Sequence, residues 1–115
     1  MHAAGVHGVA LMATPLLYRD GAQLAALALQ TGIPSVCEWA EMAQVGCLLG
    51  YGPDRAELSK RLAHHLAQIF RGAAPGELPI EQPTHYELAV NLKTAKTLSL
   101  AIPESVLVRA DEVIE

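Results

Sequence analysis

Five side chains that could bind a small polar molecule follow three short apolar runs. Thr14 follows the first run, Glu38 and Trp39 follow the second, and Tyr51 and Asp54 follow the third. They offer hydroxyl, carboxylate, indole and phenol groups, a set that suits a ligand with both polar and apolar parts. We therefore expect a ligand-binding site at these positions.

Each of these residues also has a structural interpretation. Thr14 precedes a proline and could make a local turn bond. Tyr51 could pack at a sheet edge, although its place between two glycines at a strand end favours ligand contact. Asp54 is better explained as the N-cap of the following helix. Trp39 is better explained as a packing anchor, and Glu38 could be a solvated carboxylate.

No catalytic, metal-binding or cofactor-binding pattern emerges from the other residues. Gly50 and Gly52 lack the further glycine and the lysine of nucleotide-binding loops. His64 and His65 are adjacent, so on a helix they point about 100° apart and cannot chelate one metal. A net charge of −4 without a basic run disfavours nucleic-acid binding. We expect no enzyme activity, no metal and no cofactor.

The elements that position these residues alternate between strand and helix. The three apolar runs, residues 6–12, 33–37 and 47–49, are expected to be buried strands. The helix after the first run should begin with the Asp20 carboxylate as its cap. This alternation predicts a three-layer α/β fold, with a mostly parallel sheet between helices. Ligands bind such sheets at the carboxyl ends of the strands.

The second half of the chain begins with the longest expected helix, which starts after Asp54 and carries an apolar stripe. The two prolines of residues 79–84 then require an extended segment. Residues 85–90 alternate as a half-buried strand. Asn91 should end this strand and cap the next helix. Cys37 and Cys47 border apolar runs without a CxxC spacing, so we expect buried free thiols.

The most specific wording lies in residues 78–100, LPIEQPTHYELAVNLKTAKTLSL, followed by RADEVI at residues 109–114. This text closely resembles the C-terminal end of the bacterial ABC transporter substrate-binding proteins that include tryptophan- and tyrosine-binding members. The resemblance extends back through Tyr51-Gly52-Pro53-Asp54 to Thr14-Pro15. It covers essentially the whole chain, but only the last part of the family's length.

The resemblance implies a type I periplasmic binding protein, in which two α/β lobes close on a small ligand. Residues 1–77 would then form a βαβαβα portion of the second lobe, and residues 78–115 the family tail. The N-terminal lobe would be absent. The implied partners are a small molecule, such as an amino acid, and a membrane permease. The family is exported, as periplasmic proteins or lipoproteins, whereas residues 1–13 lack the features of a signal peptide.

Two alternatives remain open at this stage. The chain could be an orphaned lobe with a structural role, which forms a homodimer through apolar surface; its 51% hydrophobic composition favours this. It could also be a small flavodoxin-like nucleotide-binding domain, although no phosphate loop is visible. The sequence departs from the family at Tyr18-Arg19-Asp20 and at Cys37-Glu38-Trp39, so the ligand's identity does not carry over.

Overall fold

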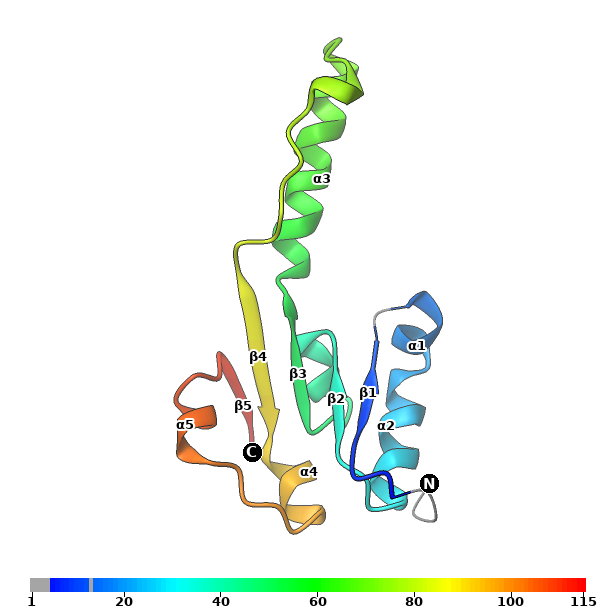
Figure 1. Cartoon of the computed structure of the whole chain (residues 1–115), viewed down its shortest axis with the longest axis vertical. Coiled ribbons are helices and arrows are strands. Elements are labelled where there is room, and N and C mark those ends of the chain that lie inside the picture. The colour runs from blue at the N-terminus through cyan, green and yellow to red at the C-terminus, as the bar shows by residue number, and fades with distance from the viewer. Residues whose placement is uncertain (1–4, 13) are drawn as a thin grey trace. The chain divides into compact units, whose positions relative to one another are not determined.

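The computed structural model describes residues 5–12 and 14–115, and it has an α/β fold around one five-stranded sheet (Figure 1). The chain divides into two compact units. The first combines the described residues up to Gly52 with Glu87–Glu115, and the second is Pro53–Tyr86. The boundary expected between residues 77 and 78 falls inside the second unit.

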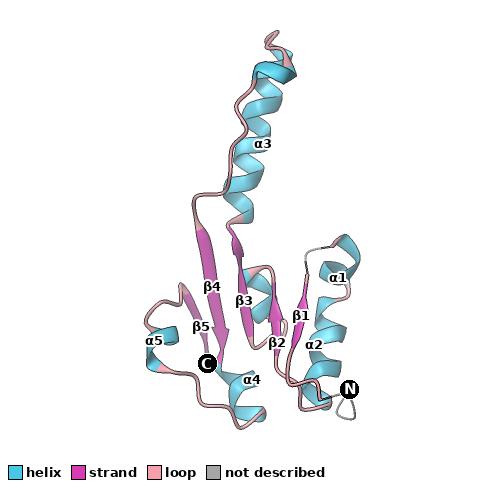
Figure 2. Cartoon of the chain, in the orientation of Figure 1, coloured by secondary structure: helices cyan, strands magenta, loops and turns pink. Residues whose placement is uncertain are grey.

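The strands follow the order β1-β2-β3-β4-β5 across the sheet. They are β1 (Val9–Leu11), β2 (Ser35–Cys37), β3 (Leu49–Pro53), β4 (Tyr86–Asn91) and β5 (Glu112–Ile114). The pairs β1–β2, β2–β3 and β4–β5 are parallel, whereas the arrows of β3 and β4 point in opposite directions (Figure 2). The expected mostly parallel sheet is confirmed.

Helices flank the sheet in the first unit: α1 (Pro15–Arg19), α2 (Gly21–Gln30), η2 (Ala40–Ala43), α4 (Leu92–Thr97) and α5 (Glu104–Leu107). The prediction of a capping carboxylate before α2 is wrong. Asp20 holds the N-cap position without a side-chain capping bond, and its backbone (φ −95°, ψ 10°) is not extended as in a usual N-cap, because Asp20 also ends α1. Its carboxylate instead accepts two hydrogen bonds from Arg19, at 2.7 and 2.9 Å.

The core lies between one face of the sheet and the helices α2 and η2. Its first cluster joins both elements to β1 and β2 through Ala25, Cys37, Met42, Cys47, Leu11 and Trp39. The chain after β2 lies very close to β3, because a Cβ at Gly50 would come within 2.5 Å of the Trp39 carbonyl oxygen, and one at Gly52 would overlap the Glu38 carbonyl oxygen. Glycine is required there because any side chain would push the segments apart.

A disulfide joins Cys37 to Cys47, whose Cα atoms lie 6.2 Å apart. The expectation of two free thiols is therefore wrong. Both residues are fully buried. Burial is expected of free cysteines and of disulfide-bonded ones alike, so it could not tell a free thiol from a disulfide. The pairing arises because the turn through η2 brings Cys47 back beside the end of β2. Its chain-entropy contribution is roughly 2.7 kcal/mol for a separation of 10 residues.

The predicted cap at Asn91 is confirmed, and the side chain also does more. Its Oδ1 accepts from the Thr94 N–H at 2.9 Å, which caps α4. Its Nδ2 donates to the Ala43 carbonyl oxygen at 2.7 Å. The Thr94 hydroxyl donates to the Gly46 carbonyl oxygen at 3.1 Å. This buried pair therefore connects the end of β4 to η2 and to the loop that follows it.

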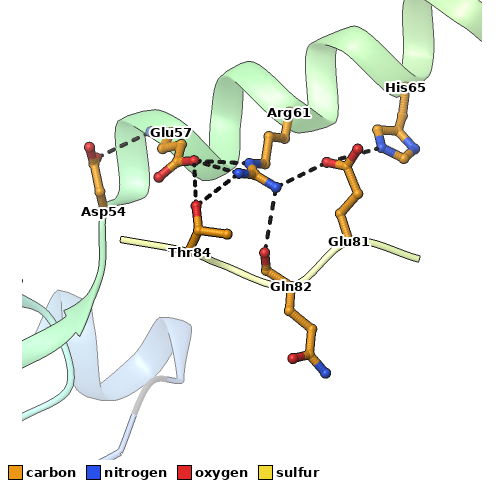
Figure 3. A network of polar contacts seen from close by, with 7 residues as sticks. All are labelled: Asp54, Glu57, Arg61, His65, Glu81, Gln82 and Thr84. Carbon is orange, nitrogen blue, oxygen red and sulfur yellow. Dashed lines mark hydrogen bonds and ion pairs between the residues drawn. The ribbon is translucent and has the colours of Figure 1, made fainter. Parts of the chain in front are cut away.

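The second unit consists of α3 (Arg55–Phe70), η3 (Pro75–Glu77) and an extended return segment, residues 78–85. Arg61 holds the return segment on the helix (Figure 3). Its guanidinium donates to Glu57 at 2.6 Å, to Glu81 at 3.1 Å and to Thr84 at 3.1 Å. The hydrogen bond to Glu57 is the largest contribution that raises the pKa of Arg61.

Within the described residues, no helix combines the length and the apolar character needed to cross a membrane. The helix α3 illustrates this, because Lys60, Arg61 and Glu57 lie within its 16 residues.

Candidate ligand-binding site

A shallow depression of about 220 Å³ lies where β1, β2 and β3 approach their carboxyl ends. Ala10, Val36 and Leu49 occupy one level of the sheet, because Val36 pairs with both of its neighbours in register. Met12, Glu38 and Tyr51 lie two residues after Ala10, Val36 and Leu49, respectively. All three line the depression. Residues at a spacing of two share one face of a sheet.

Tyr51 and Glu38 are the two candidate residues that the structure brings together. Tyr51 is 54% exposed and lines the depression. Glu38 is half-buried, and its backbone N–H donates to the Leu11 carbonyl oxygen at 3.2 Å, which extends the β1–β2 contact. The depression therefore combines an aromatic wall with one carboxylate at an otherwise largely apolar surface, lined by Met12 and Val36.

Three other candidates hold structural positions in this conformation. The Thr14 hydroxyl accepts from the Leu17 N–H at 3.2 Å and caps α1. Asp54 lies in the second unit and caps α3, since its carboxylate accepts from the N–H groups of Ala56 and Glu57 at 2.7 and 3.1 Å. Trp39 is half-buried and packs on the disulfide-containing core.

Besides Glu38 and Tyr51, the depression is lined by residues that were not predicted as site residues: Ala10, Leu11, Met12, Val36 and Cys37. Met12 is 64% exposed and Val36 is 42% exposed. The alternation of side chains along a strand could have identified Val36, because a residue two positions before Glu38 lies on the same face of the sheet as Glu38. The core side of the same strands carries Leu11 and Cys37, which face α2 and η2.

Residues 5–12 and 14–115 contain no group of three or more His, Cys, Asp or Glu side chains that could hold a metal ion.

The comparisons with known proteins agree with this architecture. The family model described as ABC transporter substrate binding protein matches residues 5–114. A structure of a conserved domain protein from Vibrio cholerae is 22% identical, with a TM-score of 0.87 over 93% of this chain and 36% of its own. The ABC domain from Streptococcus pneumonia, in complex with L-Trp, is 26% identical, with a TM-score of 0.75 over 85% of this chain and 34% of its own.

A third solved structure is a substrate-binding protein with adhesive properties from Clostridium difficile, in its ligand-free, open form. It is 15% identical, with a TM-score of 0.60 over 98% of this chain and 39% of its own. No curated protein matches the chain. The chain thus spans little more than a third of the length of these structures, and the structures below 25% identity show likeness of fold alone.

Proposed function

Because this chain belongs to the family of ABC transporter substrate-binding proteins, we propose that it supplies one wall of a small-molecule cleft and that the ligand is an amino acid. In a complete protein, a second lobe would supply the other wall. A hinge motion would close the two lobes on the ligand, and the closed form would dock on a membrane permease.

The observation that carries this proposal is the level formed by Met12 and Glu38, which directly follow β1 and β2, and Tyr51 inside β3. The Glu38 carboxylate suits an ammonium group, and the Tyr51 ring suits an apolar or aromatic side chain. The similar structure that contains L-Trp supports this ligand class. Thr14, Trp39 and Asp54 would reach a ligand only if their present contacts were exchanged on closure.

We further propose that the complete protein acts outside the cytoplasm. The Cys37–Cys47 disulfide supports this, because such bonds persist in oxidising compartments and are rare in the cytosol. No enzyme activity is part of the proposal, since the family serves transport.

Thermal unfolding in the presence of amino acids tests this function. A ligand of the folded state raises the melting temperature as its concentration exceeds its dissociation constant. We expect a dose-dependent rise with L-Trp or a related amino acid, and we expect it to be small because one wall leaves much of the ligand in water. Tyr51→Ala should abolish the rise, whereas Tyr51→Phe should retain most of it.

Tyr86→Ala provides the matched control, because Tyr86 is also exposed but lies outside the depression. Its melting curve should respond to the ligand as the unchanged chain does. A cooperative melt that no amino acid shifts would reject the proposal for this chain.

A structural role is the second candidate, and the exposed apolar side chains of α3 favour it. Leu62, Leu66 and Phe70 lie at helical spacing and are 63%, 45% and 86% exposed. A surface of this kind is typical of a protein interface. Ligand-independent dimers in sizing chromatography, lost on Leu66→Glu, would support this role. A monomer at all concentrations would exclude self-association.

A further inference from the structure

The Cys37–Cys47 disulfide lies directly behind the depression that Glu38 and Tyr51 line. Cys37 ends β2 and is itself one of the lining residues, while its side chain is buried in the core cluster. Glu38 follows it in the chain, and Cys47 lies two residues before β3. The bond therefore closes a segment, residues 38–46, that begins at the wall of the depression.

Both ends of this segment are held by the sheet. Cys37 pairs in register with residues of β1 and of β3. Leu48, next to Cys47, donates its backbone N–H to the Ser35 carbonyl oxygen of β2 at 3.0 Å. A change in the distance between the two sulfur atoms is therefore taken up by the segment rather than by the sheet.

The later part of the segment has anchors that do not involve the bond. Side chains of β4 and α4 donate hydrogen bonds to the carbonyl oxygens of Ala43 and Gly46, at 2.7 and 3.1 Å. The earlier part, residues 38–42, packs on the bond itself, because its Trp39 and Met42 side chains lie in the core cluster that contains both cysteines. Opening of the bond therefore acts on the earlier part.

The packing of β3 sets the direction in which residues 38–42 can move. A Cβ at Gly50 would come within 2.5 Å of the Trp39 carbonyl oxygen, so the segment has no room to move toward β3. Two thiols need more space than a disulfide, because unbonded heavy atoms repel one another inside roughly 3.5 Å. This space is gained when the segment moves away from β3, which separates Glu38 from Tyr51.

We propose that the Cys37–Cys47 bond is a redox latch for the depression, an inference that rests on the proposed function. With the bond formed, Glu38 and Tyr51 line one depression, which binds the amino acid. A dithiol reductant opens the latch: two electrons and two protons pass to the sulfur atoms, the S–S bond breaks, two S–H groups form, and the reductant becomes a disulfide. Residues 38–42 then move away from β3, and the affinity for the ligand falls.

The latch confines ligand binding to oxidising compartments. Cytosolic thiols keep such pairs reduced, so the chain would bind its ligand weakly there and tightly once the bond has formed. This behaviour fits the proposed site of action outside the cytoplasm.

The ligand stabilises the latch in return. If reduction weakens ligand binding by some factor, saturating ligand makes the bond harder to reduce by the same factor, because coupling between two binding equilibria is reciprocal. Both cysteines are fully buried, so a reductant reaches them through local opening of the segment. A ligand held by Glu38 and Tyr51 opposes this opening, and it should also slow reduction.

L-Trp is the probe, and dithiothreitol is the dithiol reductant. NMR of the nitrogen-15-labelled chain compares the oxidised and reduced forms. We expect reduction to change the signals of residues 38–42 and Tyr51, to leave those of β5 in place, and to weaken L-Trp binding roughly tenfold or more, within the usual range for two coupled sites. In a titration with reduced and oxidised dithiothreitol, saturating L-Trp should shift the midpoint ratio by the same factor.

Two variants separate the bond from the general stability of the fold. Cys37→Ser combined with Cys47→Ser should bind L-Trp as the reduced chain does and should not respond to dithiothreitol. Ala28→Gly, inside α2, should lower the melting temperature because glycine disfavours a helix. It should nevertheless keep the affinity for L-Trp and its response to reduction.

The latch is overturned if the folded, reduced chain binds L-Trp as tightly as the oxidised chain, or if the signals of residues 38–42 do not change on reduction. Loss of the β5 signals on reduction would also reject it, since the bond would then support the whole fold. So would a serine variant that still responds to dithiothreitol. If the oxidised chain binds no amino acid, the proposed function fails, and the signals of residues 38–42 still decide whether the bond holds this segment.

Discussion

Asn91→Ala should destabilise the chain more than a typical substitution, because it removes two buried hydrogen bonds with different partners. Asn91 is 5% exposed, and Ala43, whose carbonyl oxygen it bonds, is fully buried. Loss of the α4 cap costs about 1 kcal/mol. The Ala43 carbonyl oxygen would lose this bond but keep the one from the Gly46 N–H at 3.2 Å, so the loss adds about 0.5–1.5 kcal/mol. We expect a loss of about 1.5–2.5 kcal/mol in the free energy of unfolding.

Unfolding in urea, followed by circular dichroism, measures this loss. With a slope of about 2 kcal/mol per M, the midpoint should fall by about 0.8–1.2 M. Asn91→Ser retains a capping oxygen but is too short to reach Ala43, so it should recover about 1 kcal/mol of the loss. Thr97→Ala removes an exposed hydroxyl that bonds a helical carbonyl, and it should stay within about 0.5 kcal/mol.

Two outcomes for the Asn91 variants would contradict the roles assigned to its hydrogen bonds. A loss below about 0.5 kcal/mol for Asn91→Ala would show that these bonds do not support the fold. Equal midpoints for the alanine and serine variants would show that the cap of α4 contributes nothing.

Three other expectations follow from the same contacts. Gly52→Ala should lower the free energy of unfolding by about 1–3 kcal/mol or more, because of overpacking, whereas Gly76→Ala enters open space and should be nearly neutral in thermal melts. Reduction of the Cys37–Cys47 bond should cost roughly 2.7 kcal/mol in urea unfolding, and no change on adding reductant would argue against the bond. Arg61→Ala should speed amide hydrogen exchange in residues 79–85, with Arg61→Lys intermediate; unchanged exchange would mean that other contacts hold this segment.

Most features that depend on neighbouring residues were predictable from the sequence; the cap expected at Asp20 is the exception, since its carboxylate bonds Arg19 instead. The alternation of apolar runs and helical patterns gave the α/β class, and the caps at Asn91 and Asp54 follow from side chains that bond N–H groups two or three residues later. These signals are local, so no tertiary information is needed to interpret them.

Features that depend on contacts in space were not predictable in the same way. The disulfide requires η2 to turn Cys47 back toward Cys37, and no spacing rule reports that turn. The two glycines around Tyr51 suggested the end of a strand, but they lie inside β3 because the chain after β2 passes against them. The strand β5 has only three residues and one of them, Glu112, is charged, so its own sequence predicts a strand weakly. Its pairing with β4 decides its conformation.

The same limit applies to the candidate site. Spacing placed Glu38, Trp39 and Tyr51 at the carboxyl ends of strands, but it could not say which face each side chain occupies. The structure groups Glu38 with Tyr51 and directs Trp39 into the core. Consecutive residues after a strand often point in opposite directions, so adjacency in sequence is weak evidence for a shared site.

The return segment held by Arg61 also has a consequence for the rate of folding. Neighbouring strands β3 and β4 are joined only through the whole of α3 and residues 71–85. A long flexible connection slows strand pairing, because the chain loses the entropy of loop closure before the stabilising contacts between the strands form. A connection that first folds back on itself lowers this cost: the Asp54 N–H donates to the His85 carbonyl oxygen at 3.3 Å, beside the two strand ends. Pairing of β3 with β4 should therefore follow formation of the α3 hairpin, and stopped-flow refolding should be slower in Arg61→Ala.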